Sequence, residues 1–223
     1  MNKMVENSTN EAPQPSERNL KIIRNAKKVI ISGGVAVGKS SRIDQVIKYL
    51  NVMNIKYIYV PEYIDEKADG LEMLQKYLNG VISVFTFQKY VIEYYDEYLR
   101  NLDLSKYSEN EELIILFERG IDDAITCFTN LDYNNKNKSI TSDEVIKLYN
   151  LAISIDKKYD IPSYFIKDDK IFIPIQTEDY KRDGNIIGSI ITNRSKNNII
   201  IGLYNFNDTC FNRMMERNRP GEK

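Results

Sequence analysis

The 223-residue chain contains no histidine, and it has only two cysteines, Cys127 and Cys210. Without an imidazole, no histidine can act as a general base, and a zinc site is strongly disfavoured. Two cysteines are too few for the disulfide framework of a small secreted protein. Any acid–base chemistry must therefore use carboxylates, lysine or tyrosine.

A large net charge and long apolar runs are also lacking. The chain has 31 basic and 32 acidic residues, so no overall field attracts it to nucleic acid or to a membrane surface. No apolar run approaches the roughly 18 residues of a membrane span. Residues 1–27 are polar, contain several glutamates and lack the apolar centre of a secretion signal. We expect a disordered leader over 1–27 and an intracellular, cytoplasmic protein that binds neither nucleic acid nor membranes.

Apolar strands alternate with helices along the rest of the chain. Short apolar runs predict buried strands, and the spacing of apolar residues, together with capping signals, predicts the helices. The expected strands are 29–32, 57–62, 113–117 and 198–204; the expected helices are 39–50, two within 71–100, one that begins after Thr141, and 209–217. This alternation predicts an α/β fold with a parallel sheet.

One segment does not fit the alternation. Residues 156–197 contain a run, YFIKDDKIFIPI, that resembles a β-hairpin around Asp168-Asp169, and we interpret the whole segment as an insertion. The length of the chain favours one domain over two. We therefore expect a single domain over 28–223, with this insertion within it.

A phosphate loop lies between the first expected strand and the helix that follows. Its residues match the pattern G-x-x-x-x-G-K-[ST], in the strand–loop–helix context that the mechanism requires. Glycines let backbone N–H groups turn toward a phosphate, and the helix N-terminus adds a favourable dipole. We expect a nucleoside triphosphate to be bound by Gly33, Gly34, Val35, Ala36, Val37, Gly38, Lys39 and Ser40. GTPases, ATPases and kinases all use such loops, so the reaction stays open at this point.

Further motifs follow the phosphate loop in order: VPEYI (60–64), FTFQKY (85–90), LFERG with AITCF (116–128), and NIIIGLY with RMMERNRPGEK (198–223). Together they resemble the motifs of the deoxynucleoside kinase family, which includes the herpesviral thymidine kinases and cellular deoxycytidine kinase. The order and spacing agree over 28–150 and 198–223. The resemblance implies a P-loop kinase fold and the transfer of the γ-phosphate of ATP, with Mg²⁺, to the 5′-hydroxyl of a deoxynucleoside. It also adds a virus-infected host cell as one setting.

Charged residues at two strand ends carry the expected chemistry. Glu62 follows the second strand, and Glu118 and Arg119 follow the third, so they emerge at the carboxyl edge of the sheet, where ligands bind in open α/β folds. The resemblance makes Glu62 the base that takes the 5′-hydroxyl proton and places Arg119 near the reacting oxygen. Lys39 reaches the transferred phosphate, and Ser40 with Glu118 holds Mg²⁺. A solvated Glu62 and a structural Glu118–Arg119 pair are the alternatives.

A glutamine and several aromatic residues are candidates for the nucleoside site. Gln88 lies in a strongly apolar helix, where an unsatisfied amide is costly. Its amide matches a pyrimidine edge, and the family uses this glutamine in that way; a satisfied core glutamine is the alternative. Phe85 and Phe128 are candidates to sandwich the base, although helical aromatics more often belong to a core. Tyr77 has the offset from Gln88 of the tyrosine that cellular family members place on the sugar 3′-hydroxyl.

Three arginines gather near the end of the last expected helix. Arg213 and Arg217 share one face of that helix, and Arg219 precedes Pro220. Cations at a helix C-terminus are favoured by the dipole alone, but the planar fork of arginine also grips phosphate oxygens in pairs. We expect a lid over 213–223 that closes on ATP, and the resemblance places Glu222 on the sugar 3′-hydroxyl.

The sequence departs from the family pattern at Gly120, the third place of its [DE]-R-[SH] motif, and at the end of the chain. Directly after the lid motif the family continues with further helices and another strand, so we expect four strands, a fifth missing, and the C-terminal part of the family domain absent. Thymidine is the expected substrate, because Gln88 is combined with a small Ala124 where deoxycytidine kinase has an aspartate. The alternatives are a non-catalytic kinase-fold protein that binds nucleotide or a protein partner, and a nucleoside monophosphate kinase. A homodimer is left open.

Overall fold

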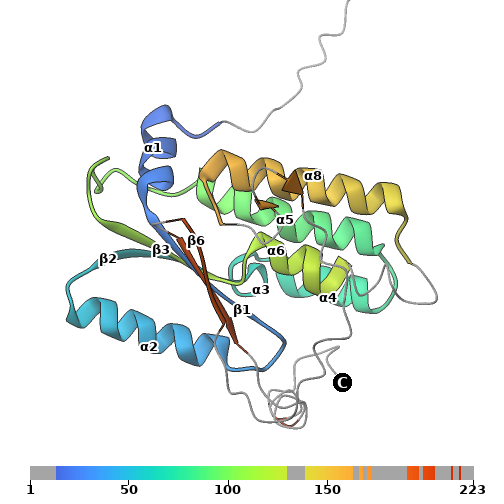
Figure 1. Ribbon diagram of the computed structural model, residues 1–223. Coiled ribbons are helices and arrows are strands. Elements are labelled where there is room, and N and C mark those ends of the chain that lie inside the picture. Colours follow the sequence, from blue (N-terminus) through green and yellow to red (C-terminus); the bar gives the residue numbers. More distant parts are fainter. Residues whose placement is uncertain are drawn as a thin grey trace, which may run out of the picture.

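The computed structural model describes residues 14–129, 139–162, 166–167, 170–171, 190–195 and 198–203, together with Asn212 and Glu216. At its centre lies a five-stranded sheet in the order β2-β3-β1-β7-β6 (Figure 1). The strands are β1 (Lys27–Gly33), β2 (Lys56–Val60), β3 (Leu113–Glu118), β6 (Ile190–Ser195) and β7 (Asn198–Leu203). Strands β2, β3, β1 and β7 are parallel, whereas β6 pairs antiparallel with β7. The chain therefore has the predicted α/β fold, built on a largely parallel sheet.

All four predicted strands are confirmed, and β6 is added at the edge of the sheet. β3 is almost entirely buried, as expected for a central strand that is covered on both faces. β6 is not predicted, because Thr192, Asn193 and Arg194 interrupt its apolar pattern. The expected hairpin is confirmed: β4 (Ile166–Lys167) pairs antiparallel with β5 (Lys170–Ile171).

The predicted helices are confirmed where the structure describes them. They are α2 (Lys39–Val52), α4 (Gly70–Leu78), α5 (Val84–Arg100) and α8 (Ser142–Tyr159), joined by the short α3 (Tyr63–Glu66), α6 (Ile121–Asp123) and the π-helix η1 (Ala124–Thr129). The capping box of α8 forms as expected, because Thr141 Oγ1 accepts from Glu144 N and Glu144 Oε2 accepts from Thr141 N. α8 continues to Tyr159, so residues 156–159 belong to this helix, and the insertion itself stays a prediction.

The expectation of a disordered leader over 1–27 is wrong for its second half. Helix α1 (Glu17–Asn25) begins after Ser16, whose hydroxyl accepts a hydrogen bond from the backbone N–H of Asn19. Ile22 and Ile23 of this helix are buried in the main core. The polar composition of the segment conceals a short amphipathic pattern that needs the rest of the domain to become buried. Residues 1–13 lie outside the described residues.

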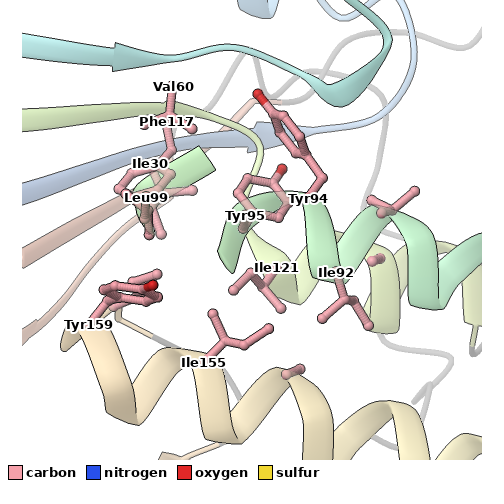
Figure 2. Packing of buried hydrophobic residues seen from close by; sticks show 14 of the residues in the cluster. Ile30, Val60, Ile92, Tyr94, Tyr95, Leu99, Phe117, Ile121, Ile155 and Tyr159 are labelled. Atoms are coloured by element: carbon pink, nitrogen blue, oxygen red, sulfur yellow. The ribbon is translucent and has the colours of Figure 1, made fainter. Parts of the chain in front are cut away.

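Two apolar clusters cover the two faces of the sheet. On one face, α5 and α8 pack side by side against the strands (Figure 1). Figure 2 shows Tyr95 and Leu99 of α5 near Phe117 of β3, and Ile155 and Tyr159 of α8 in the same cluster. On the other face, Ile43 of α2 packs against Ile31 and Leu116. None of the helices in the described part of the chain combines the length and the apolar character needed to cross a membrane.

Candidate active site

The phosphate loop connects β1 to α2 in the expected geometry. Gly33 has φ 143° and Gly38 has φ 99°, values that glycine adopts much more readily than other residues. Ala36 also has a positive φ of 59°, and backbone strain of this kind is found at functional loops. α2 begins directly after Gly38, so the N–H groups of its first turn are available to an anion. The loop therefore has a conformation that can accommodate an anion, and its binding of phosphate stays a prediction.

Strand register brings the charged residues to this loop. Ile31 of β1 lies opposite Glu118 of β3, and Val60 of β2 lies opposite Phe117. Because the three strands are parallel, Glu62, Arg119 and the phosphate loop all follow them at the carboxyl edge of the sheet. This is the edge at which open α/β folds bind ligands.

Glu62 lies between two cations. Arg119 Nε donates to Glu62 Oε1 at 2.8 Å, and Lys39 Nζ lies 3.6 Å from the same oxygen. Lys39 also donates to the carbonyl of Gly34 at 3.0 Å, and Arg119 Nη1 donates to the carbonyl of Gly33 at 2.7 Å. The Glu62 side chain is only 15% exposed, so it is not a solvated residue at a strand end.

Burial changes the electrostatics of this group. It lowers the pKa of Lys39, and the charge of Arg119 lowers it further, whereas the carboxylates of Glu62, Asp123 and Glu118 raise it. For Arg119, burial also acts to lower the pKa, but Glu62 and Asp123 outweigh it, and the net direction is upward. Charges in such a water-poor site interact more strongly than they would at the surface.

Ser40 and Glu118, the two residues expected to hold a cation, lie in direct contact. Ser40 Oγ donates to Glu118 Oε1 at 2.7 Å, and the hydroxyl of Tyr59 donates to Glu118 Oε2. A hydroxyl and a carboxylate are hard oxygen ligands of the kind that Mg²⁺ uses beside phosphate oxygens, so this pair fits the ion. The described residues hold no group of three or more side chains of the kinds that bind metals.

Tyr59 is a member of this group that the sequence patterns do not single out. Burial, followed by the hydrogen bond to Glu118 and the charge of Glu118, raises the pKa of Tyr59 well above its usual value. The phenol therefore remains a proton donor to Glu118 throughout the neutral range. The sequence signal that could have identified Tyr59 is its position directly before the V-P-E motif.

A cavity of about 390 Å³ lies beside the loop, and its wall contains Lys39, Ser40, Glu62, Glu118 and Arg119. An apolar part of the wall is formed by Leu74, Leu78, Val91 and Ala124. Gln88 also lines the cavity; it is 1% exposed, and neither atom of its amide has a hydrogen-bond partner among the described residues. An unmade buried hydrogen bond costs about 1–3 kcal/mol, so Gln88 is not the satisfied core residue of the alternative interpretation.

The aromatic part of the wall differs from the expectation in one residue. Tyr77 lines the cavity, as expected, and its ring is stacked on that of Phe87, with centroids 4.5 Å apart and planes 2° from parallel. Phe85 is not among the residues that line the cavity, and it packs against the main core. Two helical residues that are two positions apart point about 200° apart, so Phe85 points away from Phe87, which lines the cavity. The side chain of Phe128 lies outside the described residues.

Asp123 is a buried carboxylate on the cavity wall that the sequence patterns missed. It is 3% exposed, its Oδ1 accepts from the hydroxyl of Ser32, and its Oδ2 accepts from the backbone N–H of Gly120 at 3.2 Å. Burial raises the pKa of Asp123, while the charge of Arg119 and both hydrogen bonds act in the opposite direction. Its position three residues after a helix cap is a signal that could have identified it.

The expected lid cannot be placed against this site. Arg213, Arg217, Arg219 and Glu222 lie outside the described residues, so their roles stay predictions. Only Asn212 and Glu216 of the last expected helix are described, and both are helical and exposed.

Comparison with known proteins finds similarity to solved structures but not to known sequences. No protein-family model and no curated protein matches the sequence. Among solved structures, the chain is similar to that of the deoxyadenosine kinase from M. mycoides with bound dATP, with 21% sequence identity and a TM-score of 0.45. The match covers 88% of this chain and 74% of that chain. The site described above rests on the geometry of the chain itself.

Proposed function

We propose that the protein is a deoxynucleoside kinase that transfers the γ-phosphate of ATP to the 5′-hydroxyl of a deoxynucleoside. The observation that carries the proposal is Gln88, a buried amide without a partner in the described structure, on the wall of the cavity that also contains the phosphate loop and Glu62. A donor–acceptor edge of a base satisfies this amide. The same ligand brings a sugar hydroxyl within the cavity that holds Glu62.

The charged residues fit the steps of phosphoryl transfer. Such enzymes act mainly by positioning and by stabilising charge on the phosphoryl oxygens, with a base for the attacking hydroxyl. Glu62 takes the proton of the 5′-hydroxyl, and the hydrogen bond from Arg119 at 2.8 Å holds its carboxylate in place. Lys39 leaves its contacts with Gly34 and Glu62 for the phosphate oxygens of ATP.

Magnesium and ATP complete the proposed reaction. Ser40 and Glu118 would hold the Mg²⁺, which neutralises charge on the phosphates when it is bound. The 2.7 Å contact between their oxygens places the two ligands close enough to share one ion. The residues of the loop from Gly33 to Ser40 would bind the phosphates, and the arginines Arg213, Arg217 and Arg219 would close over them as a lid.

The charge of the cavity favours a neutral acceptor over a nucleoside monophosphate. Among the described residues of the wall, Lys39 and Arg119 are the cations, and both contact Glu62. The wall also carries the carboxylates of Asp65, Glu118 and Asp123. An acceptor phosphate would be repelled by these carboxylates, whereas the hydroxyl of a nucleoside would not.

Thymidine is the deoxynucleoside that we propose as the preferred substrate. The amide of Gln88 can donate to a carbonyl oxygen of thymine and accept from its ring N–H. Ala124 lies on the same wall and is small, which leaves room for a methyl group. Tyr77, stacked on Phe87, lies on the same wall, and we assign it to the sugar 3′-hydroxyl.

A phosphorylation assay tests the proposal. The protein is incubated with ATP, Mg²⁺ and, in separate reactions, each of the four deoxynucleosides and each of their 5′-monophosphates, and the phosphorylated products are measured by chromatography. We expect turnover with at least one deoxynucleoside, highest with thymidine. Product from a nucleoside monophosphate alone would instead establish a monophosphate kinase, and ATP binding without any product would establish a non-catalytic nucleotide-binding protein.

A further inference from the structure

Arg119 has an unusual backbone conformation for a residue that must be placed accurately. Its φ is 64°, in the left-handed region that residues with a Cβ rarely adopt. Its backbone N–H donates to the carbonyl of Ile31 at 3.0 Å, and its side chain reaches Gly33 and Glu62. A strained residue keeps such a conformation only when its neighbours determine it. The backbone directly after Arg119 must therefore be held by a neighbouring residue.

Asp123 holds the backbone directly after Arg119. Its Oδ2 accepts from the N–H of Gly120, the residue directly after Arg119, and its own N–H donates to the carbonyl of Gly120 at 3.0 Å. Its Oδ1 accepts from the hydroxyl of Ser32, the residue directly before the phosphate loop. One buried carboxylate therefore joins the end of β1 to the turn that carries Arg119.

Gly120 completes this arrangement. A Cβ on Gly120 would lie 3.2 Å from Cγ2 of Ile30, which is closer than ordinary contact. The turn therefore lies directly against β1, and a side chain at 120 would require Ile30 to shift by a few tenths of an ångström. This close approach gives a physical reason for glycine where the family motif has serine or histidine.

We infer that Asp123 is a positioning residue, whose paired hydrogen bonds to Ser32 and Gly120 hold the guanidinium of Arg119 at Glu62 and at the phosphate loop. The inference rests on the proposed function for its catalytic consequence, but the position of Arg119 itself is measurable without any reaction. In this role Asp123 contacts neither the phosphates of ATP nor the 5′-hydroxyl of the nucleoside; it acts through Arg119.

Two substitutions separate hydrogen bonding from mere packing. Asp123→Asn keeps both contacts, because its amide oxygen can accept from Gly120 N–H and its amide nitrogen can donate to Ser32 Oγ. Asp123→Ala loses both contacts, and Ser32→Ala loses one. Asp122→Ala is the matched control, since Asp122 is equally buried in the same helix but is not part of the cavity wall.

The first readout is the ¹⁵N–¹H NMR signal of the Arg119 Nε–H group, assigned by its loss in Arg119→Lys. We expect a protected signal in the wild type, in Asp123→Asn and in Asp122→Ala, and a shifted, rapidly exchanging signal in Asp123→Ala. The second readout is steady-state kinetics. Misplacing a catalytic group by about 1 Å costs roughly 100-fold in rate, so we expect Asp123→Ala to lower kcat by about 30- to 100-fold, with both KM values within about threefold of wild type.

Each remaining outcome is informative. An unchanged Arg119 signal in a folded Asp123→Ala protein would overturn the inference, and so would an Asp123→Asn protein as impaired as Asp123→Ala. If Asp123→Ala does not fold, Ser32→Ala decides: a shift of the Arg119 signal supports the inference, and an unchanged signal overturns it. If the wild type phosphorylates no deoxynucleoside, the proposed function fails, while the NMR comparison still tests the position of Arg119.

Discussion

Two buried lysines at opposite ends of β1 have very different surroundings. Lys28, near the start of the strand, is 0% exposed, donates to the carbonyl of Arg24 at 2.8 Å and lies 3.9 Å from a carboxylate oxygen of Asp160. Lys39, beyond the end of the strand, is 6% exposed and lies among three carboxylates and Arg119. Burial lowers the pKa of both lysines, that of Lys28 to about 8.

The difference separates a buried charge that the fold tolerates from one that it can use. Lys28 is compensated by a carbonyl and a distant carboxylate, and it belongs to no described cavity. Lys39 is surrounded by groups that converge from β1, β2 and β3 on a cavity and on a helix N-terminus. Strongly perturbed ionisable groups mark functional sites only with such convergence, and four experiments test this contrast.

The largest expected effect is that of Lys39→Ala. Losing the cation that stabilises the transferred phosphoryl group is expected to lower kcat by about 1,000-fold, at the upper end of the losses for one electrostatic group. The matched control is Lys28→Met, which removes an equally buried ammonium at the other end of β1 and is expected to leave kcat within about twofold of wild type. Both variants are compared by product formation and by circular dichroism. Equal losses of activity in Lys39→Ala and Lys28→Met would show that the two buried lysines do not differ in function.

Glu62→Gln is expected to have the second largest effect. It keeps the size of the side chain but removes the proton acceptor, so the single-turnover rate falls by about 100-fold, the usual scale for a general base. ATP binding, measured by calorimetry, is expected to change little. Glu66→Gln serves as the control, because Glu66 is an exposed residue of the neighbouring helix α3. A single-turnover rate close to wild type would show that another group takes the proton.

Gln88→Ala is expected to weaken the binding of the deoxynucleoside. Losing two hydrogen bonds in a closed pocket costs about 2–3 kcal/mol, and binding of ATP is affected less. The exposed Gln45 of α2 offers a matched control, Gln45→Ala. Dissociation constants for both ligands decide the matter: an equal loss for ATP and nucleoside would indicate a defect of folding rather than of base recognition.

The smallest expected effect concerns the pH dependence of stability at Lys28. Its pKa is about 8 in the folded protein and 10.5 when unfolded, so between these values the unfolded chain binds more protons. Stability therefore rises with pH over this window, by about 1–2 kcal/mol after relaxation of the site. Urea unfolding of wild type and Lys28→Met at about pH 7 and about pH 10 measures it.

The test depends on the direction in which the stability difference between wild type and Lys28→Met changes with pH. The free energy of unfolding of wild type is expected to rise relative to that of Lys28→Met as the pH rises. Only wild type carries a buried ammonium, and the cost of burying it disappears when Lys28 loses its proton. Many tyrosines, among them Tyr94, have their pKa raised by burial and destabilise the fold in alkali, but they are common to both proteins. A constant difference between the two proteins would show that Lys28 stays hydrated.

Local patterns account for most of what could be predicted. Strands 29–32 and 113–117 were visible as short apolar runs, and the start of α8 was visible as the pair Thr141 and Glu144. Gln88 was visible because an amide interrupts an apolar helix. Each of these signals lies within a few residues of the chain, so each can be read without knowing the neighbours in space.

Other features needed the assembled domain. α1 is marginal as an isolated helix and is stabilised by burying Ile22 and Ile23 against elements far away in the sequence. The pairing of β6 with β7 depends on a segment that has no clear strand pattern. Which phenylalanine of α5 faces the cavity is decided by the rotation of the helix against the sheet, which selects Phe87 and not Phe85.

By itself, the sequence determined the phosphate loop, the order of strands and helices, and the residue types available for chemistry, because these depend on local spacing. Only the tertiary structure decided that Glu62 contacts both Lys39 and Arg119, and that Asp123 joins Ser32 to Gly120. These contacts connect residues up to 91 positions apart. The register of parallel strands brings such residues together, and no local pattern in the chain records that register.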